Sequence, residues 1–168
     1  MRTLLLMRHA KSDWDADYGA DHDRPLNDRG VRSARIMGRL LTAEDLAPDL
    51  VVTSTAVRAR STAEIAKEAG SWTAEIVLEP RLYGTKSDIA IQVAAAAPRV
   101  TRLMLVGHQP AWSILVTALT GERVEMRTAT VVFIDLELDD WAGLAPAGGS
   151  VGAVHQPRDH FGGEFDRD

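Results

Sequence analysis

The sequence predicts an α/β fold of three layers, in which helices cover both faces of a mostly parallel β-sheet that has an antiparallel edge. Short apolar runs alternate with helical segments through the first 120 residues, a pattern typical of parallel strands joined by crossover helices. A β-rich segment closes the chain and is expected to add the antiparallel edge. The 168 residues, 45% of them hydrophobic, fit one domain. This domain is expected to span residues 1–157, followed at 158–168 by a polar tail that is expected to be partly disordered.

Six segments are predicted to be strands. Four are expected in the parallel part, and the first and last of these are apolar runs that indicate buried strands. The four comprise residues 3–7, 50–52, 75–78 and 103–106. The closing pair comprises residues 131–138, the longest β-rich run, and a last strand near 151–154.

Four segments between these strands carry helix signals. In the first, apolar residues recur at helical spacing from Val31 to Leu41, and Asn27 or Asp28 is expected to be the N-cap. The others are expected to run from a cap within 53–55 to about residue 69, from a cap at Ser87 to just before Pro98, and onward from Pro110 at the first helical position.

The bulk composition excludes several functional classes. Because the chain has no cysteine, it cannot form disulfides, thiolate-bound zinc sites or iron–sulfur clusters, and it has no cysteine nucleophile. A net charge of −5 gives no reason to expect nucleic acid or an anionic membrane as a partner. The apolar run at 4–7 is too short for a signal sequence or a membrane span, so a cytoplasmic protein is expected.

Three polar segments directly follow predicted parallel strands. They are residues 8–12 (RHAKS), residues 53–58 (TSTAVR) and residues 107–109 (GHQ). Ligands of such sheets bind beyond the carboxyl ends of the strands, so these segments are expected to meet at one edge although they lie about 50 residues apart. Their convergence predicts a binding site.

The residue types in these segments favour a phosphoryl group. Arg8 and Arg58 present planar guanidinium groups that match phosphate oxygens, and Arg58 is expected in the first turn of its helix, where an anion is favoured. Their charges should lower the pKa of His9 and leave its imidazole neutral and nucleophilic. With fixed cations facing the anion, no metal is required.

Structural roles remain open for each of these residues taken alone. A single histidine or arginine after a strand is more often a structural hydrogen-bond donor than a catalytic group. His108 could cap its helix, and Arg58 could pair with Asp49 or Glu64.

Several motifs, in order, resemble those of the histidine phosphatase superfamily, also called the phosphoglycerate mutase-like superfamily. They are Arg8-His9-Ala10, RPLNDRG at 24–30, STAVRARST at 54–62 and GHQP at 107–110. Within the superfamily, the chain is most similar to the short, SixA-like phosphohistidine phosphatases, with which it shares the Arg-His-Ala form, the LYG stretch at 82–84 and the ending at 141–157. The resemblance spans about residues 2–157.

The resemblance implies the phosphoglycerate mutase-like fold and a phosphohistidine intermediate on His9, without a metal or cofactor. Arg8, Arg58 and His108 would complete the phosphate pocket, and His108 would donate to the equatorial oxygens. Lys11 and Ser12, in the same loop as His9, are expected to make secondary substrate contacts.

One departure from the family pattern concerns the proton donor. Many members carry a glutamate two residues after a leucine in the loop that follows the third strand, and it protonates the leaving alcohol. Here Leu82 is followed by Tyr83 and Gly84, so that acid is absent. Glu79 and Asp88 are near in sequence but do not occupy the matching position.

Residues 13–28 form an Asp-rich loop with six aspartates. It is not a calcium-binding EF-hand loop, because Gly19 stands at position seven instead of six and Arg24 stands where the bidentate glutamate is required. The loop is expected to be solvated near the pocket mouth, where it would repel highly anionic molecules and favour a cationic or protein-borne substrate. It could also supply a substitute acid.

Three functional hypotheses follow. The leading one is a phosphatase that acts on phosphohistidine in proteins through phospho-His9. The second is a phosphatase or mutase acting on a small phosphate ester with the same fold, and the third is a catalytically idle phosphate-binding module. The expected partner is a phosphorylated protein or a small phosphate ester, and the sequence carries no prediction of oligomeric state.

Overall fold

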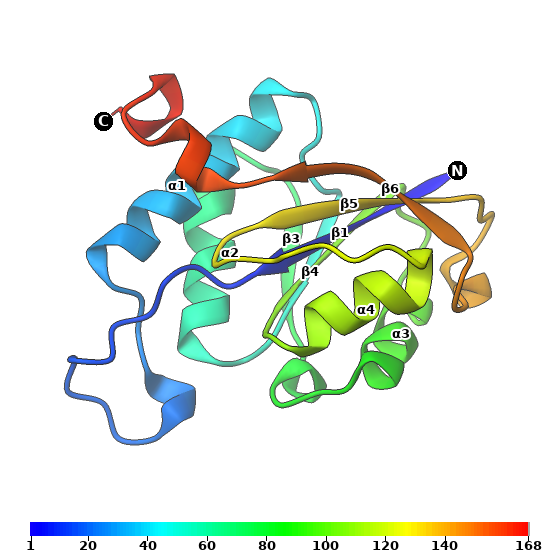
Figure 1. The fold of residues 1–168 in the computed structure, drawn as a ribbon, viewed down its shortest axis with the longest axis horizontal. Helices are drawn as coiled ribbons and strands as arrows, with labels where there is room; N and C mark the ends of the chain where they lie inside the picture. The colour runs from blue at the N-terminus through cyan, green and yellow to red at the C-terminus, as the bar shows by residue number, and fades with distance from the viewer. Residues whose placement is uncertain (168) are drawn as a thin grey trace.

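A computed structural model describes residues 1–167 and places six strands in one sheet, in the order β3-β2-β4-β1-β5-β6 (Figure 1). The strands are β1 (Arg2–Arg8), β2 (Leu50–Thr53), β3 (Glu75–Leu78), β4 (Arg102–Gly107), β5 (Val131–Leu136) and β6 (Gly149–His155). The first four pair in parallel, while β5 pairs antiparallel with both β1 and β6. The predicted fold class, a mostly parallel sheet with an antiparallel edge, is therefore confirmed.

Helices cover both faces of the sheet. They are α1 (Asp28–Ala43), α2 (Val57–Gly70), α3 (Ser87–Ala95) and α4 (Ala111–Thr120). Figure 1 shows α1 and α2 on one side of the sheet and α3 and α4 on the other. Within residues 1–167, no helix combines the length and the apolar character that crossing a bilayer requires.

The central strand β1 contributes to both halves of the core. Leu4 and Leu6 pack into the cluster under α3 and α4, whereas Leu5 and Met7 pack into the cluster under α1 and α2. All four side chains are fully buried. Successive residues of a strand point to opposite faces, so a continuous apolar run is what a strand between two helical layers needs.

Helix starts differ from the sequence prediction at three places. The N-caps are Ala56 for α2, Lys86 for α3 and Pro110 for α4, and none of them caps through its side chain. The Ser54 hydroxyl accepts from Ala56 N–H at 3.2 Å, so it serves the turn before α2 and not the helix itself. For α1, the expected cap Asn27 is confirmed, since its side chain accepts from Gly30 N–H at 2.8 Å.

The C-terminal tail lies against α1 instead of being partly disordered as the composition suggests. After β6 it forms two short 3-10 helices, Pro157–His160 and Glu164–Asp166. Phe165 packs against the core cluster under α1 and α2, and Arg39 donates to the Phe165 carbonyl at 3.0 Å. A partly buried aromatic ring and a backbone contact hold these residues against α1, which composition alone could not indicate; residue 168 lies outside the described residues.

Candidate active site

A pocket of about 890 Å³ lies where the carboxyl ends of β1, β2 and β4 meet. All six residues expected at the site line it: Arg8, His9, Lys11, Ser12, Arg58 and His108. The structure therefore confirms that the three segments meet at one edge of the sheet, as the strand topology predicts. The catalytic and binding roles of these residues remain predictions.

Backbone hydrogen bonds hold the loops after these three strands against one another. His9 N–H donates to the Gly107 carbonyl at 2.9 Å, and Ser54 N–H donates to the Val106 carbonyl at 3.0 Å. Gly107 is required for this packing, because a Cβ there would lie 2.5 Å from the indole ring of buried Trp112. His108 is thereby set beside His9, with 5.2 Å between the ring centroids.

His9 is held in one tautomer. Its Nδ1 lies 2.6 Å from the Ala10 carbonyl, which can only accept, so Nδ1 carries the proton and Nε2 keeps its lone pair. Burial, reinforced by nearby His108, Arg58 and Arg8, lowers the pKa of His9 to about 3. A buried, neutral imidazole with a free nitrogen is suited to nucleophilic attack near neutral pH.

His108 is also neutral near pH 7. Burial, followed by the charge of Arg58, lowers its pKa to about 4. Its Nε2 lies 2.8 Å from Ser54 Oγ, which already accepts from Ala56 N–H and can donate its own proton to that nitrogen. The side chain of His108 therefore contacts Ser54 across the site and does not cap α4.

Both histidines should make the fold less stable in acid. Their folded-state pKa values lie far below the ordinary value of about 6.5. Between about pH 6.5 and 4, the two histidines are therefore protonated in the unfolded chain but not in the folded one. The free energy of unfolding should fall as the pH drops from about 6.5 toward 4, by up to about 1.4 kcal/mol per pH unit for each histidine.

The measurement is urea unfolding at pH 7, 6 and 5 for the wild type and for His9→Asn. Asp21 and Asp166, whose pKa values are lowered to about 2, lose their contribution only below this window, because a depressed carboxyl titrates between its ordinary value and about 2. The slope should be shallower in His9→Asn. Equal slopes in the two proteins would contradict the lowered pKa.

The two arginines leave donor capacity for an anion. Arg58, the second residue of α2, is only 6% exposed, and Arg8 donates from Nη1 to the Met126 carbonyl at 3.1 Å. The Nε atoms of both side chains are buried without a hydrogen-bond partner. A buried donor without a hydrogen bond destabilises the fold, and a bound oxyanion would accept from these two Nε–H groups.

Asp21 is one of the pocket residues that the sequence did not predict. Its carboxylate accepts from Arg58 Nη2 and from Arg24 Nη2, each at 3.0 Å, and from the Tyr83 hydroxyl at 2.9 Å. The Tyr83 hydrogen bond, followed by those from Arg24 and Arg58, lowers the pKa of Asp21 to about 2. The only signal in the sequence was membership of the Asp-rich loop, which did not distinguish Asp21 from its neighbours.

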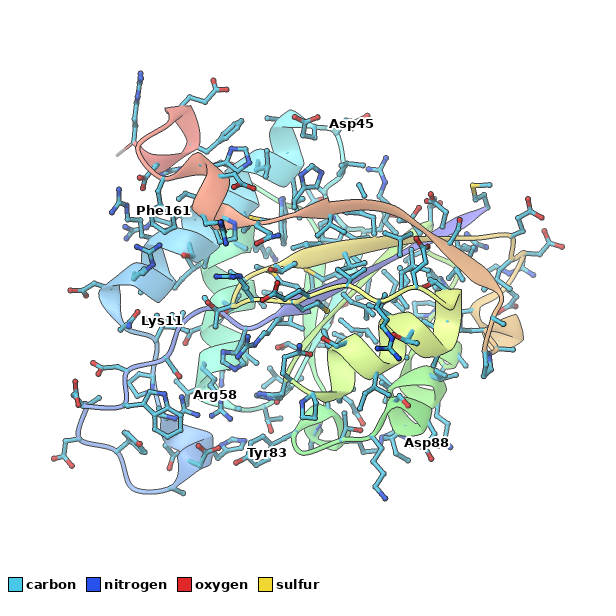
Figure 2. The ribbon with its side chains drawn as sticks, in the orientation of Figure 1. Lys11, Asp45, Arg58, Tyr83, Asp88 and Phe161 are labelled. Carbon is cyan, nitrogen blue, oxygen red and sulfur yellow. The ribbon has the colours of Figure 1, made fainter. Side chains whose placement is uncertain are left out.

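The alternative partners of Arg58 are occupied elsewhere. Asp49 accepts from the backbone N–H of Arg102 at 2.8 Å, and Glu64 accepts from Arg60 at 2.8 Å. Arg58 instead donates to Asp21 through both terminal nitrogens, and Figure 2 shows it at the same end of the molecule as Tyr83.

Lys11 and Ser12 differ in their surroundings. The Ser12 hydroxyl is buried and accepts from Arg24, so it positions that guanidinium in the structure. Lys11 is exposed at the pocket edge, and its carbonyl abuts Gly30, where a Cβ would lie 2.1 Å from the oxygen. Only glycine allows the start of α1 to approach this loop so closely.

Arg58→Ala should therefore reduce turnover at least about tenfold more than Lys11→Ala does, because bidentate binding by a buried guanidinium is not replaced by an exposed charge. The comparison is kcat/KM of both variants on one substrate, after circular dichroism has shown that both are folded. Equal losses, or a larger loss from Lys11→Ala, would mean that the anion binds elsewhere in the pocket.

The position of the expected proton donor holds a glycine in a left-handed conformation. Gly84 lines the pocket with φ at 64°, a region that disfavours glutamate. Among residues 1–167, Asp21 is the one carboxylate that lines the pocket, and neither Glu79 nor Asp88 does. Because Asp21 has its pKa lowered to about 2, it is ionised near pH 7 and has no proton to donate.

The pocket is more basic than the Asp-rich loop suggests. The expectation of a mouth that repels anions is wrong in this respect, because Asp21 alone of the six aspartates at 13–28 lines the pocket. Seven of the lining residues are lysine or arginine. Asp15, Asp17, Asp23 and Asp28 are exposed and do not line the pocket, which spacing could not predict.

A metal-binding cluster is not found at the site. No group of three or more His, Asp or Glu side chains within the described part of the chain is placed to hold a metal ion. The donors that face the pocket are guanidinium, ammonium and imidazole groups, which suit an anion.

Comparisons with known proteins show which proteins the chain resembles. The model of the histidine phosphatase superfamily (branch 1) matches residues 4–86. An uncharacterized protein of Mycobacterium tuberculosis is 37% identical over 164 residues, which cover 90% of this chain and all of that protein.

Solved structures extend the similarity to the whole fold. A candidate phosphohistidine phosphatase SixA of Nakamurella multipartitia has a TM-score of 0.82 and 31% identity, covering 93% of this chain and 96% of that one. The protein histidine phosphatase SixA in complex with tungstate has a TM-score of 0.80 and 22% identity, covering 94% of this chain and 98% of the other. At that identity, the second likeness concerns the fold alone.

Proposed function

Since the chain belongs to the histidine phosphatase superfamily, we propose that its phosphatase activity is directed at phosphohistidine in proteins and proceeds through phospho-His9. The SixA neighbour of Nakamurella multipartitia, described as a candidate phosphohistidine phosphatase, supports this substrate class. The partner is then a phosphorylated protein whose phosphohistidine enters the pocket.

The reaction proceeds in two displacements. The Nε2 lone pair of His9 forms a bond to phosphorus while the bond from phosphorus to the leaving nitrogen breaks, and that nitrogen takes the electron pair. Water then attacks phosphorus from the side opposite His9, releasing phosphate and restoring the imidazole. Arg8, Arg58 and His108 hold the non-bridging oxygens in both steps and stabilise the charge that develops on them.

One observation favours a phosphohistidine leaving group above the others. The only carboxylate lining the pocket within residues 1–167 is Asp21, which is held ionised by Tyr83, Arg24 and Arg58. An alkoxide needs a proton from a positioned acid, whereas an imidazole, with an ordinary pKa of about 6.5, can leave already protonated.

The direct test is turnover of a phosphohistidine peptide, a phosphoserine peptide and p-nitrophenyl phosphate by the same preparation. The proposal expects the order phosphohistidine, then the aryl ester, then phosphoserine. A protein that binds phosphate but turns over none of the three would be the idle module. Faster turnover of a small alkyl phosphate, assayed beside these three, would favour the small-molecule phosphatase, whose substrate a pocket of about 890 Å³ could accommodate.

Activity should survive a chelator and be inhibited by vanadate. The groups that neutralise the phosphoryl charge are fixed cations, and vanadate takes up the five-coordinate geometry of the transition state. Turnover of the phosphohistidine peptide is compared before and after treatment with EDTA and gel filtration. Loss of turnover that added divalent metal restores would overturn the metal-free mechanism.

A further inference from the structure

The pocket extends well beyond the space that a phosphoryl group needs. Its 890 Å³ lies in the range of pockets that enclose whole small ligands. Seven cations line it. Arg8 and Arg58 are assigned to the phosphoryl group in the proposed function, and Arg24 and Arg58 donate to Asp21. The other four are Lys11, Arg29, Arg127 and Arg158, and we call them the basic arm.

Separate elements bring the basic arm together. Arg29 is in the first turn of α1, beside the Gly30 contact with the Lys11 carbonyl. Arg127 precedes Ala129, whose N–H lies 3.1 Å from the carbonyls of both Arg8 and His9. Arg158 lies in the short helix after β6 that packs on α1. The fold therefore sets four cations from distant parts of the chain beside the His9 loop.

The basic arm has little charge compensation of its own. Among residues 1–167, neither Lys11 nor Arg29 has a carboxylate within 4.0 Å. Arg127 lies 3.4 Å from Glu125 and Arg158 lies 4.0 Å from Asp159, but all four of these side chains are more than half exposed. Exposed pairs contribute little, so these cations remain available to a ligand.

One cation of the arm is held in place by an aromatic ring. The guanidinium carbon of Arg29 lies 4.2 Å from the centre of the Phe161 ring, and Phe161 also lines the pocket. Stacking fixes the guanidinium plane and leaves its N–H edge for an oxyanion. Figure 2 shows Tyr83, Arg58, Lys11 and Phe161 following one another along one side of the molecule.

We propose that the basic arm binds a second oxyanion of the same substrate, the carboxylate of an acidic residue that lies close to the phosphohistidine in the substrate protein. The inference rests on the proposed function and adds a sequence preference to it. Trp14 supports a polypeptide ligand, because it lines the pocket while remaining 69% exposed, and tryptophan is enriched where proteins bind one another.

The substrate side of the proposal is tested with peptides that contain one phosphohistidine. A glutamate is placed in turn at each of the three positions before and after it, and every peptide has a partner with glutamine at that position. At the best position, the wild type should show at least about fivefold higher kcat/KM for glutamate, which corresponds to one or two exposed charge pairs. Ratios within about twofold at all six positions would overturn the proposal.

The enzyme side is tested with the double variant Arg29→Gln/Arg158→Gln. Its preference for glutamate should fall below about twofold. Arg99→Gln removes an exposed arginine that does not line the pocket, and it should keep the wild-type preference. A double variant that retains the full preference would overturn the role of the arm.

The same experiments separate failure of the arm from failure of the proposed function. Turnover of the glutamine peptides measures phosphohistidine phosphatase activity without any second anion. Absence of that turnover contradicts the proposed function, whereas turnover that ignores glutamate contradicts the arm alone. Phenyl phosphate and benzene-1,3-diyl bisphosphate provide the small-molecule comparison. If the enzyme prefers the bisphosphate but shows no preference for glutamate among the peptides, the second oxyanion is not a carboxylate of a substrate protein and the proposal is overturned.

Discussion

His9→Ala is expected to lower turnover by several orders of magnitude while leaving the fold intact. A nucleophile that forms the covalent intermediate cannot be replaced by the groups that only hold the phosphoryl oxygens. The fold should tolerate the change, because the one side-chain hydrogen bond of His9 is to the neighbouring Ala10 carbonyl. Removing a buried polar ring leaves no distant group without its partner.

The measurement is kcat on a phosphohistidine peptide, with thermal unfolding as the test of the fold. His160→Ala is the matched control, because that histidine lies in the tail outside the pocket lining. A second readout is phosphorylated protein in a rapid alkaline quench, which should appear with the wild type and disappear with His9→Ala. If the variant keeps more than about a tenth of the wild-type rate, the covalent route through His9 is wrong.

The sheet could be predicted closely because the strands leave a strong local pattern. The central parallel strands are buried on both faces, so runs such as Leu4 to Met7 are apolar without interruption, whereas the edge strand β3 is mostly exposed. Helix starts were harder, since the polar residues at 53–55 that look like caps are engaged elsewhere. Ser54 serves the turn to Ala56 and contacts His108. Local propensity cannot distinguish a cap from a residue that belongs to the site.

The site could be predicted in its parts that follow strands directly. Arg8, His9 and His108 are placed by the ends of β1 and β4, and topology alone brings those ends together. Asp21 is different, because it lies in a loop whose path depends on tertiary packing. Its position follows from contacts with Arg58 and Tyr83, residues 37 and 62 positions away in the chain.

The basic arm escaped the sequence reading for a similar reason. Arg127 lies in a segment for which the sequence predicts no helix or strand, and Arg158 lies in the tail that is expected to be partly disordered. Pairing of β5 with β1 and β6 carries both back to the His9 loop. Total charge pointed away from an anionic ligand, while the pocket gathers seven cations.

Catalysis is expected to depend steeply on the leaving group. A positioned general acid contributes roughly 10²–10⁴-fold in rate when an alkoxide leaves, and the pocket offers no protonated carboxyl within residues 1–167 near pH 7. We therefore expect phosphohistidine to be cleaved well, activated aryl phosphates moderately and phosphoserine poorly. Across aryl phosphates of graded leaving-group basicity, kcat/KM should fall steeply as basicity rises.

Asp21→Asn distinguishes a positioning carboxylate from a hidden acid. If Asp21 only positions Arg24 and Arg58, the variant should change phosphohistidine and phosphoserine turnover by similar factors. The fall of kcat/KM with rising leaving-group basicity should then stay as steep as in the wild type. If Asp21 supplied a proton, phosphoserine turnover alone would fall by roughly 10²-fold or more, because a protonated imidazole does not need the acid. A flat dependence on basicity in the wild type, with phosphoserine as fast as phosphohistidine, would contradict the acid-free mechanism. The small phosphate ester would then be the better substrate, and Glu79, Asp13 and Asp15 would be the next residues to substitute.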